Sequence, residues 1–384
     1  MSKAKSNTAT NDSPPRHRIW IVSGILAAFC AIGLLTVWLE REPTFGGKSV
    51  SQWFEKSEPM TSDEYQNSEC RTAFAEMEGD AVPFLNGWLD LRPSSFDGIY
   101  AFCFQHMSSS VKKALPKPRD DSYYRVRKHH ALRLLGDIGM TQRFRLEAGK
   151  PSAKPSIALA VPRIKIAMQG SDADARLWAA NAAWFIGPVA AATIPDLIKL
   201  AQNPQERAAS AAVQGLGMMG SLASNAVPML IAVATNTDRR DRILAISALG
   251  NIGGSAHLAT RILTLMLNDT NDSVRLQATR SLAAIGTTPD EAISSLNTLT
   301  HGTNDWERCF AWIALWNKDR QDSKLQAHVI EGLQSTNRIG VLVILRLLGT
   351  NAAVFVPEVR HLTEDSFAAD VARRTLREIQ LSQP

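Results

Sequence analysis

The sequence predicts an all-α protein in which pairs of helices stack into a right-handed superhelix, preceded by one transmembrane helix. Three observations predict this architecture. Several residue types recur at intervals of 33 residues through the middle of the chain. The apolar residues between them follow the period of an α-helix. Near the N-terminus, an uncharged apolar run is long enough to cross a bilayer.

Three columns of residues keep the 33-residue interval and define a repeated unit. They are Gly187, Gly220, Gly253 and Gly286; Ala179, Ala212, Ala245, Ala278 and Ala311; and Leu216, Leu249, Leu282 and Leu315. Within one unit, Ala212, Leu216 and Met219 lie at i, i+4 and i+7, on one side of a helix. Because this stripe is too narrow to make a core by itself, each helix must bury it against the next copy, as in a solenoid.

Each unit divides into two helices. A column of prolines marks the start of the first helix, where a missing N–H costs little: Pro162, Pro195 and Pro228. A column of short polar residues is placed to cap the second helix: Asp172, Asp238, Asn271 and Asn304. The glycine column is then predicted to end the second helix in the left-handed conformation.

A further column predicts how neighbouring second helices pack. It contains Trp184, Gly217, Gly250, Ala283 and Trp316. Its members are small in the middle and large at both ends. We expect the helices to approach closely in the centre, with tryptophans filling the margins.

The segments that begin at Ala226 and Arg261 resemble HEAT repeats of the short bacterial type that bilin lyases also contain. The resemblance rests on the proline of the first helix, the Asp or Asn of the turn and a closing Leu-x-x-Ile-Gly, together with Arg242, Arg275 and Arg308. It covers roughly residues 63–379 and implies a HEAT-like superhelix. HEAT arrays serve many partners, so the resemblance is specific for fold and weak for function.

The N-terminal region predicts a membrane anchor. Residues 1–18 are polar and are expected to be a disordered tail. Residues 19–39 are uncharged and mainly apolar, with Trp20 and Trp38 near the ends, where indole rings favour the membrane interface. The alternatives are a cleavable signal peptide, a lipoprotein anchored at Cys30 and a buried soluble helix.

Basic residues before the apolar run predict the orientation. They are expected to keep the N-terminus in the cytoplasm. The solenoid would then lie on the other side of a single-pass anchor, in the periplasm of a bacterium with two membranes.

The remaining chain divides into a linker and the repeat array. The predicted segments are a juxtamembrane linker at residues 40–62, a solenoid at residues 63–379, an insertion at residues 93–122, and a next repeat helix at Arg125–Gly139. In the linker, Val50, Trp53 and Phe54 are expected to dock on the first repeat as a cap.

The insertion combines aromatic residues with a basic run. Phe102 and Phe104 precede Lys112, Lys113 and Lys117. One interpretation is that this segment, close to a membrane anchor, lies on anionic headgroups with its aromatic rings in the interface. The alternative is a solvated loop whose basic residues keep it soluble.

The candidate partner-binding residues lie on the second helices and point away from the alanine stripe. They are Trp178, Asn181, Phe185, Gln214, Met218, Leu244, Ser247 and Arg280. In HEAT arrays the second helices line the concave side, so the resemblance places these residues there. The apolar start of the row predicts that a partner segment covers it. The alternative is a loop, Met140–Ser156, that folds over Trp178 and Phe185.

Nothing in the pattern predicts a metal, a cofactor, a small-molecule substrate or a catalytic residue. The four cysteines lack Cys-x-x-Cys spacing, and Cys70 and Cys103 could pair only in an oxidising compartment. The net charge of +5 includes five basic and three acidic residues in residues 1–42. The excess that remains is too small to favour nucleic acid as a partner.

The sequence therefore predicts a membrane-anchored scaffold or adaptor that binds a protein partner and carries out no catalysis. One alternative is a HEAT-like lyase or another enzyme-associated protein. A second alternative is a structural element of the envelope.

Overall fold

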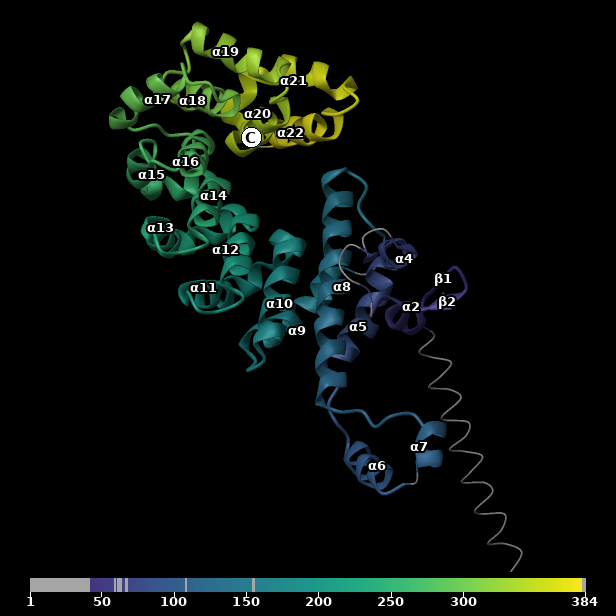
Figure 1. Ribbon diagram of the computed structural model, residues 1–384. Helices are drawn as coiled ribbons and strands as arrows, with labels where there is room; N and C mark the ends of the chain where they lie inside the picture. Colours follow the sequence, from purple (N-terminus) through teal and green to yellow (C-terminus); the bar gives the residue numbers. More distant parts are fainter. Residues whose placement is uncertain are drawn as a thin grey trace, which may run out of the picture.

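The computed structural model describes residues 42–58, 60, 64–65, 68–107, 109–153 and 156–381. Within these residues the chain is a curved stack of helices (Figure 1). The predicted tail, residues 1–18, and the predicted transmembrane helix, residues 19–39, lie outside the described residues.

Helices of two kinds alternate along the stack. The first helices of the units are α5 (Val82–Leu89), α9 (Val161–Gln169), α11 (Ile194–Gln202), α13 (Val227–Thr235), α15 (Thr260–Met266), α17 (Ile293–Leu299), α19 (Ser323–Gln334) and α21 (Val356–His361). The second helices are α8 (Asp121–Glu147), α10 (Ala173–Ile186), α12 (Ala209–Met218), α14 (Arg242–Ile252), α16 (Asp272–Ile285), α18 (Asp305–Lys318), α20 (Arg338–Leu348) and α22 (Ala369–Leu381). In Figure 1, α11, α13 and α15 lie on the outer side of the curve and α12, α14 and α16 on the inner side. The predicted solenoid of helix pairs is confirmed.

Short 3₁₀ helices connect most of the pairs. They are η1 (Glu78–Ala81), η2 (Ile157–Ala160), η3 (Gly187–Thr193), η4 (Gly220–Ala226), η5 (Gly253–Ala259), η6 (Asp290–Ala292), η7 (Gly349–Phe355) and η8 (Leu362–Glu364). Three merged stretches, residues 173–202, 242–266 and 338–364, are long and apolar enough to span a membrane by length and composition. Each is a second helix followed by its 3₁₀ turn and at least part of the next first helix, and its apolar residues face the neighbouring repeats.

Local sequence explains where the helices begin. Prolines stand in the first turn of α9, α11 and α13. The side chains of Asp172, Asn271 and Asn304 accept backbone N–H groups at the start of α10, α16 and α18, as predicted. The prediction for Asp238 is wrong, because the turn is longer there and α14 begins after Asp241.

The glycine column ends the second helices with positive φ, as predicted. The φ angle is 71° at Gly187, 58° at Gly220, 69° at Gly253 and 78° at Gly286. At Gly286 ψ is 10°, which completes the left-handed helical conformation. At Gly187 and Gly253 ψ is −141° and −146°. With positive φ, these angles lie in a backbone region that is energetically unfavourable for residues with a side chain.

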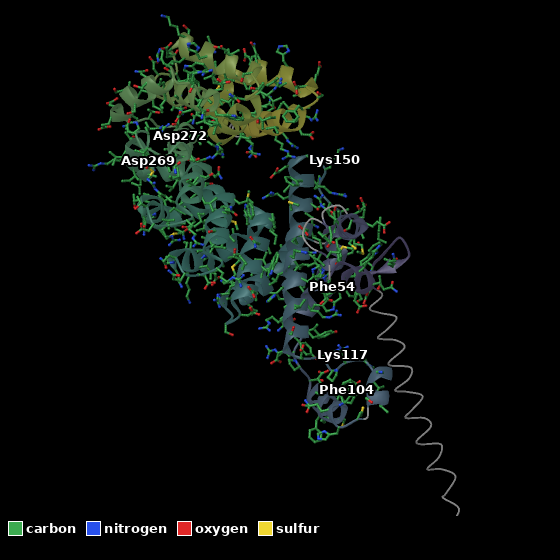
Figure 2. All side chains as sticks on the ribbon, viewed as in Figure 1. Phe54, Phe104, Lys117, Lys150, Asp269 and Asp272 are labelled. Carbon is green, nitrogen blue, oxygen red and sulfur yellow. The ribbon has the colours of Figure 1, made fainter. Side chains whose placement is uncertain are left out.

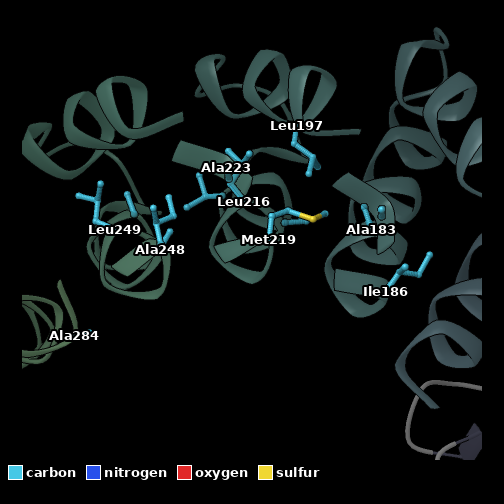
Figure 3. Close-up of a cluster of buried hydrophobic side chains, with 14 of the residues drawn as sticks. Ala183, Ile186, Leu197, Leu216, Met219, Ala223, Ala248, Leu249 and Ala284 are labelled. Atoms are coloured by element: carbon cyan, nitrogen blue, oxygen red, sulfur yellow. The ribbon is translucent and has the colours of Figure 1, made fainter. Parts of the chain in front are cut away.

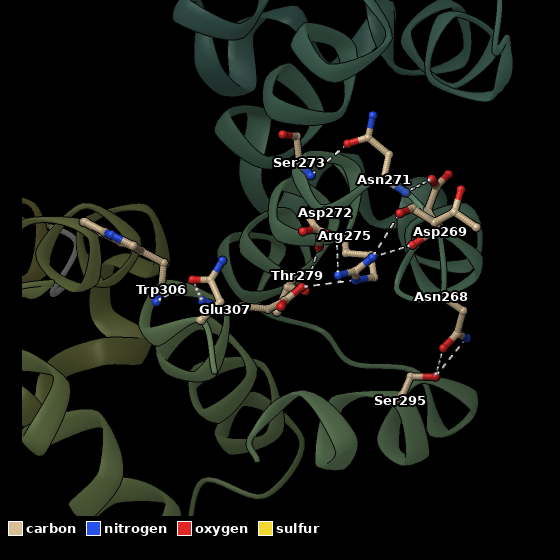
Figure 4. Close-up of polar contacts among 12 residues, drawn as sticks. Asn268, Asp269, Asn271, Asp272, Ser273, Arg275, Thr279, Ser295, Trp306 and Glu307 are labelled. Carbon is tan, nitrogen blue, oxygen red and sulfur yellow. Dashed lines mark hydrogen bonds and ion pairs between the residues drawn. The ribbon is translucent and has the colours of Figure 1, made fainter. Parts of the chain in front are cut away.

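The arginine column joins the two helices of each unit. Arg275 Nη1 donates to the carbonyl oxygen of Asp269 at 2.9 Å, and Nη2 donates to the Asp272 carboxylate at 2.6 Å (Figure 4). The equivalent bonds run from Arg242 to the Ala234 carbonyl at 2.9 Å and from Arg308 to the Gly302 carbonyl at 2.8 Å. Each arginine thus satisfies a carbonyl group at the end of the first helix.

Small residues let neighbouring second helices approach closely, as predicted. A Cβ on Gly250 would lie 2.8 Å from Ser281 Cα, and one on Gly217 would lie 2.9 Å from Ala248 Cα. The core around this contact consists of alanine, leucine, isoleucine and methionine side chains (Figure 3). The two glycines therefore set the spacing of α12, α14 and α16.

A small cap closes the N-terminal end of the stack. Strand β1 (Thr44–Phe45) pairs antiparallel with β2 (Lys48–Ser49), and α2 (Val50–Ser57) and α4 (Glu69–Met77) follow. This hairpin is an addition to the predicted all-α fold. Val50, Trp53 and Phe54 are buried, the docking that the linker was expected to make. The Phe54 ring centroid lies 3.8 Å from that of Trp88 and 4.6 Å from that of His130.

A buried hydrogen bond ties this cap to α8. Ser57 Oγ donates to the carbonyl oxygen of Phe54 and lies 2.7 Å from His130 Nε2, so the imidazole must donate to the hydroxyl. Burial, together with the nearby charges of Arg133 and Arg127, lowers the pKa of His130 to about 3. The imidazole is therefore neutral at physiological pH. Ser57 is fully buried, and this places the serine–histidine pair in the core.

Helix α8 is longer than predicted. The prediction that the repeat helix is Arg125–Gly139 is wrong, since the helix runs from Asp121 to Glu147. Gly139 does not end the helix, because a Cβ there would lie 2.3 Å from Ile186 Cγ1 and the glycine is needed for close packing. The insertion accordingly ends before Asp121, and much of the predicted loop Met140–Ser156 is helical.

The sequence left the pairing of Cys70 and Cys103 open. Cys70 is buried on α4, Cys103 is exposed on α6 (Ser95–Gln105), and both are free thiols. Their pairing in an oxidising compartment, one possibility raised by the sequence, is not found in this structure.

The C-terminal units turn inward. The row of second helices runs from α8 to α18, but α20 packs against α22, α16 and α19 more than against α18. From the middle of α22, Arg374 Nη1 donates to Glu147 Oε2, at the C-terminal end of α8, at 2.8 Å. The curve of helices thus returns toward its own beginning (Figure 1).

Candidate partner-binding surface

The predicted partner-binding residues lie on α10, α12, α14 and α16, and all of them are half-buried. They are Trp178, Asn181 and Phe185 on α10; Gln214 and Met218 on α12; Leu244 and Ser247 on α14; and Arg280 on α16. Four of them, at equivalent positions of successive repeats, form one row: Asn181, Gln214, Ser247 and Arg280. In this row Arg280 Nη1 lies 3.4 Å from Ser247 Oγ, which belongs to the preceding repeat.

The apolar start of the surface is partly covered by the protein itself. A Cβ on Gly136 of α8 would lie 3.2 Å from Phe185 Cδ2, so the Phe185 ring packs on α8. The Phe185 ring also stacks on Trp184, with ring centroids 4.8 Å apart. Helix α8 therefore covers the Phe185 ring.

Arg280 lies beside an apolar cavity of about 340 Å³ between α16, α18 and α20. The cavity is lined by Leu276, Gln277, Arg280, Trp306, Phe310, Gly340 and Val343. The Trp306 ring lies directly over Gly340, where a Cβ would overlap it, and its side chain stays 38% exposed. Gln277 Oε1 is buried here and has no hydrogen-bond partner in the part of the chain that the structure describes.

The predicted lipid-contacting residues lie on two helices that project from the stack, α6 and α7 (Ser109–Ala114) (Figure 2). Phe102 is 65% exposed, Phe104 is half-buried, and Lys113 and Lys117 are exposed. Lys112 is half-buried and its Nζ donates to the carbonyl oxygen of Gln105 at 2.8 Å.

The apolar side of α6 is solvent-exposed. No residue of α6 is buried, and Phe96 and Ile99 are 72% and 61% exposed on the same side of the helix as Phe102. The Tyr100 hydroxyl donates to the Pro116 carbonyl at 2.6 Å and ties α6 to the segment after α7. The insertion is therefore an ordered helical hairpin with an uncovered apolar face.

A second cleft, of about 400 Å³, lies where the insertion leaves and rejoins the stack. It is lined by the end of α5, the start of α8, the end of α9 and the start of α10. The cleft is lined by Arg92, Arg125 and Lys128 and by the ion pair of Arg163 with Asp90 at 2.8 Å. Asp172 also lines it, and its Oδ2 lies 3.0 Å from His129 Nε2. Its charges are mixed, so its lining favours no one class of ligand.

The sequence analysis missed three arginines that face Arg280 or its surroundings. They are Arg143 on α8, Arg346 on α20 and Arg374 on α22. More than 200 residues separate the first from the others, so no local pattern could bring them together. In the described part of the chain, no three His, Cys, Asp or Glu side chains gather where they could hold a metal ion.

Comparisons with known proteins agree with this architecture. The profile of the family described as HEAT repeats matches residues 160–250 and 227–316. A search of curated proteins found no match.

Several solved structures are similar to this chain. An engineered protein (target OR497) is 17% identical, covers 86% of this chain and 98% of its own length, and has a TM-score of 0.38. The Escherichia coli protein YibA is 14% identical over 76% of this chain and 99% of its own, with a TM-score of 0.35. The complex of CpcE and CpcF of phycocyanin lyase from Nostoc sp. PCC7120 is 18% identical over 76% of this chain and 97% of its own, with a TM-score of 0.36.

The family match falls on the units in which the proline, arginine and glycine columns are most regular. The same units show the two-helix repeat and the stacked second helices in the structure. The chain therefore contains HEAT repeats, and the matched repeats lie in residues 160–316.

Proposed function

We propose that this protein is a membrane-tethered, non-catalytic scaffold that binds a segment of a protein partner on the inner side of its superhelix. The row Asn181, Gln214, Ser247 and Arg280 carries the proposal. These polar side chains occupy equivalent positions on four successive helices, and all four remain half-exposed. Repeat arrays present such continuous inner surfaces to extended partners.

The tether in this proposal is the apolar run at residues 19–39. Its flanking charges place the N-terminus in the cytoplasm and the solenoid outside it. The alternative proposals are a lyase-type protein, which would carry a chromophore, and a structural element of the envelope, which crosslinking in cells would reveal.

The double variant Asn181→Arg with Gln214→Arg tests the scaffold proposal. Two long charged side chains in the middle of the row should block a bound segment, and we expect recovery of the partner to fall at least about tenfold. The measurement is a pull-down from solubilised membranes with the full-length chain as bait, quantified by mass spectrometry.

The matched control places the same substitutions on first helices. Gln202 on α11 and Asn297 on α17 are exposed. Gln202→Arg with Asn297→Arg should leave partner recovery unchanged. Equal losses from both double variants, or none from either, would remove the inner row from the proposal.

A second function is favoured by the uncovered hairpin. We propose that α6 and α7 rest on an anionic membrane surface, with Phe96, Ile99 and Phe102 at the interface. Exposed apolar side chains and neighbouring lysines are the combination that interfacial helices use. The predicted span at residues 19–39 would hold the hairpin close to a bilayer.

Lys113→Glu with Lys117→Glu tests this contact, because both side chains are exposed and lie outside the core. Reversing two charges should weaken binding to vesicles with phosphatidylglycerol by at least about tenfold, at roughly 1 kcal/mol per basic residue. The full-length chain is reconstituted in the vesicles, which are isolated by flotation. Contact of the hairpin with the membrane is then measured as its protection from protease. Lys199→Glu with Lys324→Glu, also exposed, is the control. Protection that is the same in all variants would count against the lipid contact.

A further inference from the structure

Four arginines from four helices converge where the C-terminal units meet the end of α8. They are Arg143 on α8, Arg280 on α16, Arg346 on α20 and Arg374 on α22. Burial lowers the pKa of Arg143, and Arg346 and Arg374 lower it further. Burial and Arg346 likewise lower the pKa of Arg280. Arg346 therefore lies near both Arg143 and Arg280, and Arg374 lies near Arg143, in agreement with the packing of α20 against α16 and α22. These neighbouring guanidinium groups repel one another.

Glu147 offsets part of this positive charge. Its Oε2 accepts from Arg374 Nη1 at 2.8 Å, and its Oε1 lies 3.6 Å from Arg143 Nε. Arg280 donates to neutral acceptors, Ser247 Oγ at 3.4 Å and Asn251 Oδ1 at 3.1 Å. No carboxylate in the described part of the chain forms an ion pair with Arg346. A second carboxylate, Asp370, also lies near Arg374, but it forms an ion pair with Arg373 at 2.6 Å. The four guanidinium groups therefore keep an excess of positive charge.

Packing holds this charge in place. The Arg143 guanidinium lies against Gly187, where a Cβ would be 3.2 Å from Cδ and from Nη1. Its Nε and Nη1 are buried without a hydrogen-bond partner among the described residues. Phe144 lies beside the cluster, with its ring centroid 5.2 Å from the Arg143 guanidinium and 5.5 Å from that of Arg374. The Arg143 guanidinium is thus positioned by packing before any anion binds, which reduces the entropy cost of binding.

The apolar cavity next to Arg280 adds a second element. Its volume of about 340 Å³ and its lining of Leu276, Trp306, Phe310 and Val343 suit one large apolar side chain. Arg280 belongs to both the cavity and the arginine cluster. A ligand that fits both must carry carboxylates next to an apolar residue.

We propose that the cluster of Arg143, Arg280, Arg346 and Arg374 binds an acidic segment of a protein partner, with one apolar side chain of that segment in the cavity beside Arg280. This inference rests on the proposed scaffold function and adds the chemistry of the partner. Carboxylates would replace the repulsion among the arginines with charge-assisted hydrogen bonds. The site exists only in the folded array, because its residues come from both ends of the solenoid.

A binding assay with a defined probe tests the proposal. The probe is a fluorescein-labelled glutamate peptide with one central leucine, and its binding to the full-length chain is followed by fluorescence anisotropy. Arg280→Ala with Arg346→Ala should weaken binding at least about tenfold. Arg240→Ala with Arg261→Ala, at exposed positions, removes the same charge elsewhere and should change affinity less than about twofold.

Thermal unfolding separates a binding role from a structural one. Arg346 forms no ion pair with a carboxylate among the described residues. Arg346→Ala alone should therefore weaken peptide binding and leave Tm unchanged or higher. Replacing the central leucine of the probe with serine should also weaken binding, because the cavity would lose its occupant.

Three results would overturn the inference. The first is an equal affinity of both double variants for the peptide, and the second is a glutamate peptide that binds no more tightly than a lysine peptide. The third is full displacement of the glutamate peptide by millimolar inorganic phosphate at constant ionic strength. The last result would assign the site to a free phosphate. If partner recovery still depends on Asn181 and Gln214 while the peptide result is negative, the scaffold proposal stands and only the acidic chemistry fails.

Discussion

Gly250→Val should lower the free energy of unfolding by at least about 3 kcal/mol. Gly250 lies inside α14, where a larger residue would normally stabilise the helix by up to about 1 kcal/mol. Here a Cβ would lie 2.8 Å from Ser281 Cα and 2.9 Å from its Cβ, and neither atom can rotate away. The backbones of α14 and α16 would have to separate, and the core between the two repeats would lose contact.

Urea unfolding followed by far-UV circular dichroism measures this effect. Gly87 on α5 is the control, because a Cβ there would meet nothing within 4 Å and the residue is exposed. Gly87→Ala should be neutral or stabilising by up to about 1 kcal/mol. If Gly250→Val is as stable as the unaltered chain, the close approach of the two helices would be disproved.

Trp316→Ala should cost about 3–5 kcal/mol, the range for large aromatic residues removed from a core. The Trp316 side chain is 1% exposed on α18. Its ring packs edge-on against Phe355 of η7, with ring centroids 4.8 Å apart, and the Arg320 guanidinium lies 5.8 Å from its centroid. This residue joins the regular array to the C-terminal units, so its loss should release those units first.

Hydrogen exchange followed by mass spectrometry would locate the change. In Trp316→Ala, amides of α19 to α22 should exchange faster than those of α10 to α14. Trp316→Phe is the matched variant, because Trp316 Nε1 is buried and no described residue forms a hydrogen bond with it. Phenylalanine removes that unpaired donor and keeps most of the ring, so we expect a loss below about 1.5 kcal/mol. A larger loss with phenylalanine than with alanine would contradict this account.

Much of the array could be predicted from the sequence because each repeat uses the same local physics. The prolines, the caps at Asp172, Asn271 and Asn304, and the positive φ of the glycine column depend on neighbours within a few residues. The small column at Gly217 and Gly250 was also sufficient to predict close packing. Periodicity reports these features because each copy meets the same surroundings.

The features that could not be predicted lie where that periodicity stops. Gly139 has the same sequence context as a helix-ending glycine, yet it lies inside α8 because Ile186 packs against it. The inward turn of α20 depends on contacts with α16, more than 50 residues earlier. The arginine cluster requires both ends of the array at once. No local pattern carries this information, since it appears only when the superhelix has folded.

The ion pair between Arg374 and Glu147 spans 227 residues of sequence, and its side chains are 23% and 32% exposed. A pair this open to water contributes only about 0–1 kcal/mol, so thermal motion should break it often. In the proposed scaffold function, a partner segment could then enter the inner side of the superhelix laterally, as a loop. It would not have to enter by a free terminus. Long proteins with both termini occupied would remain accessible as cargo.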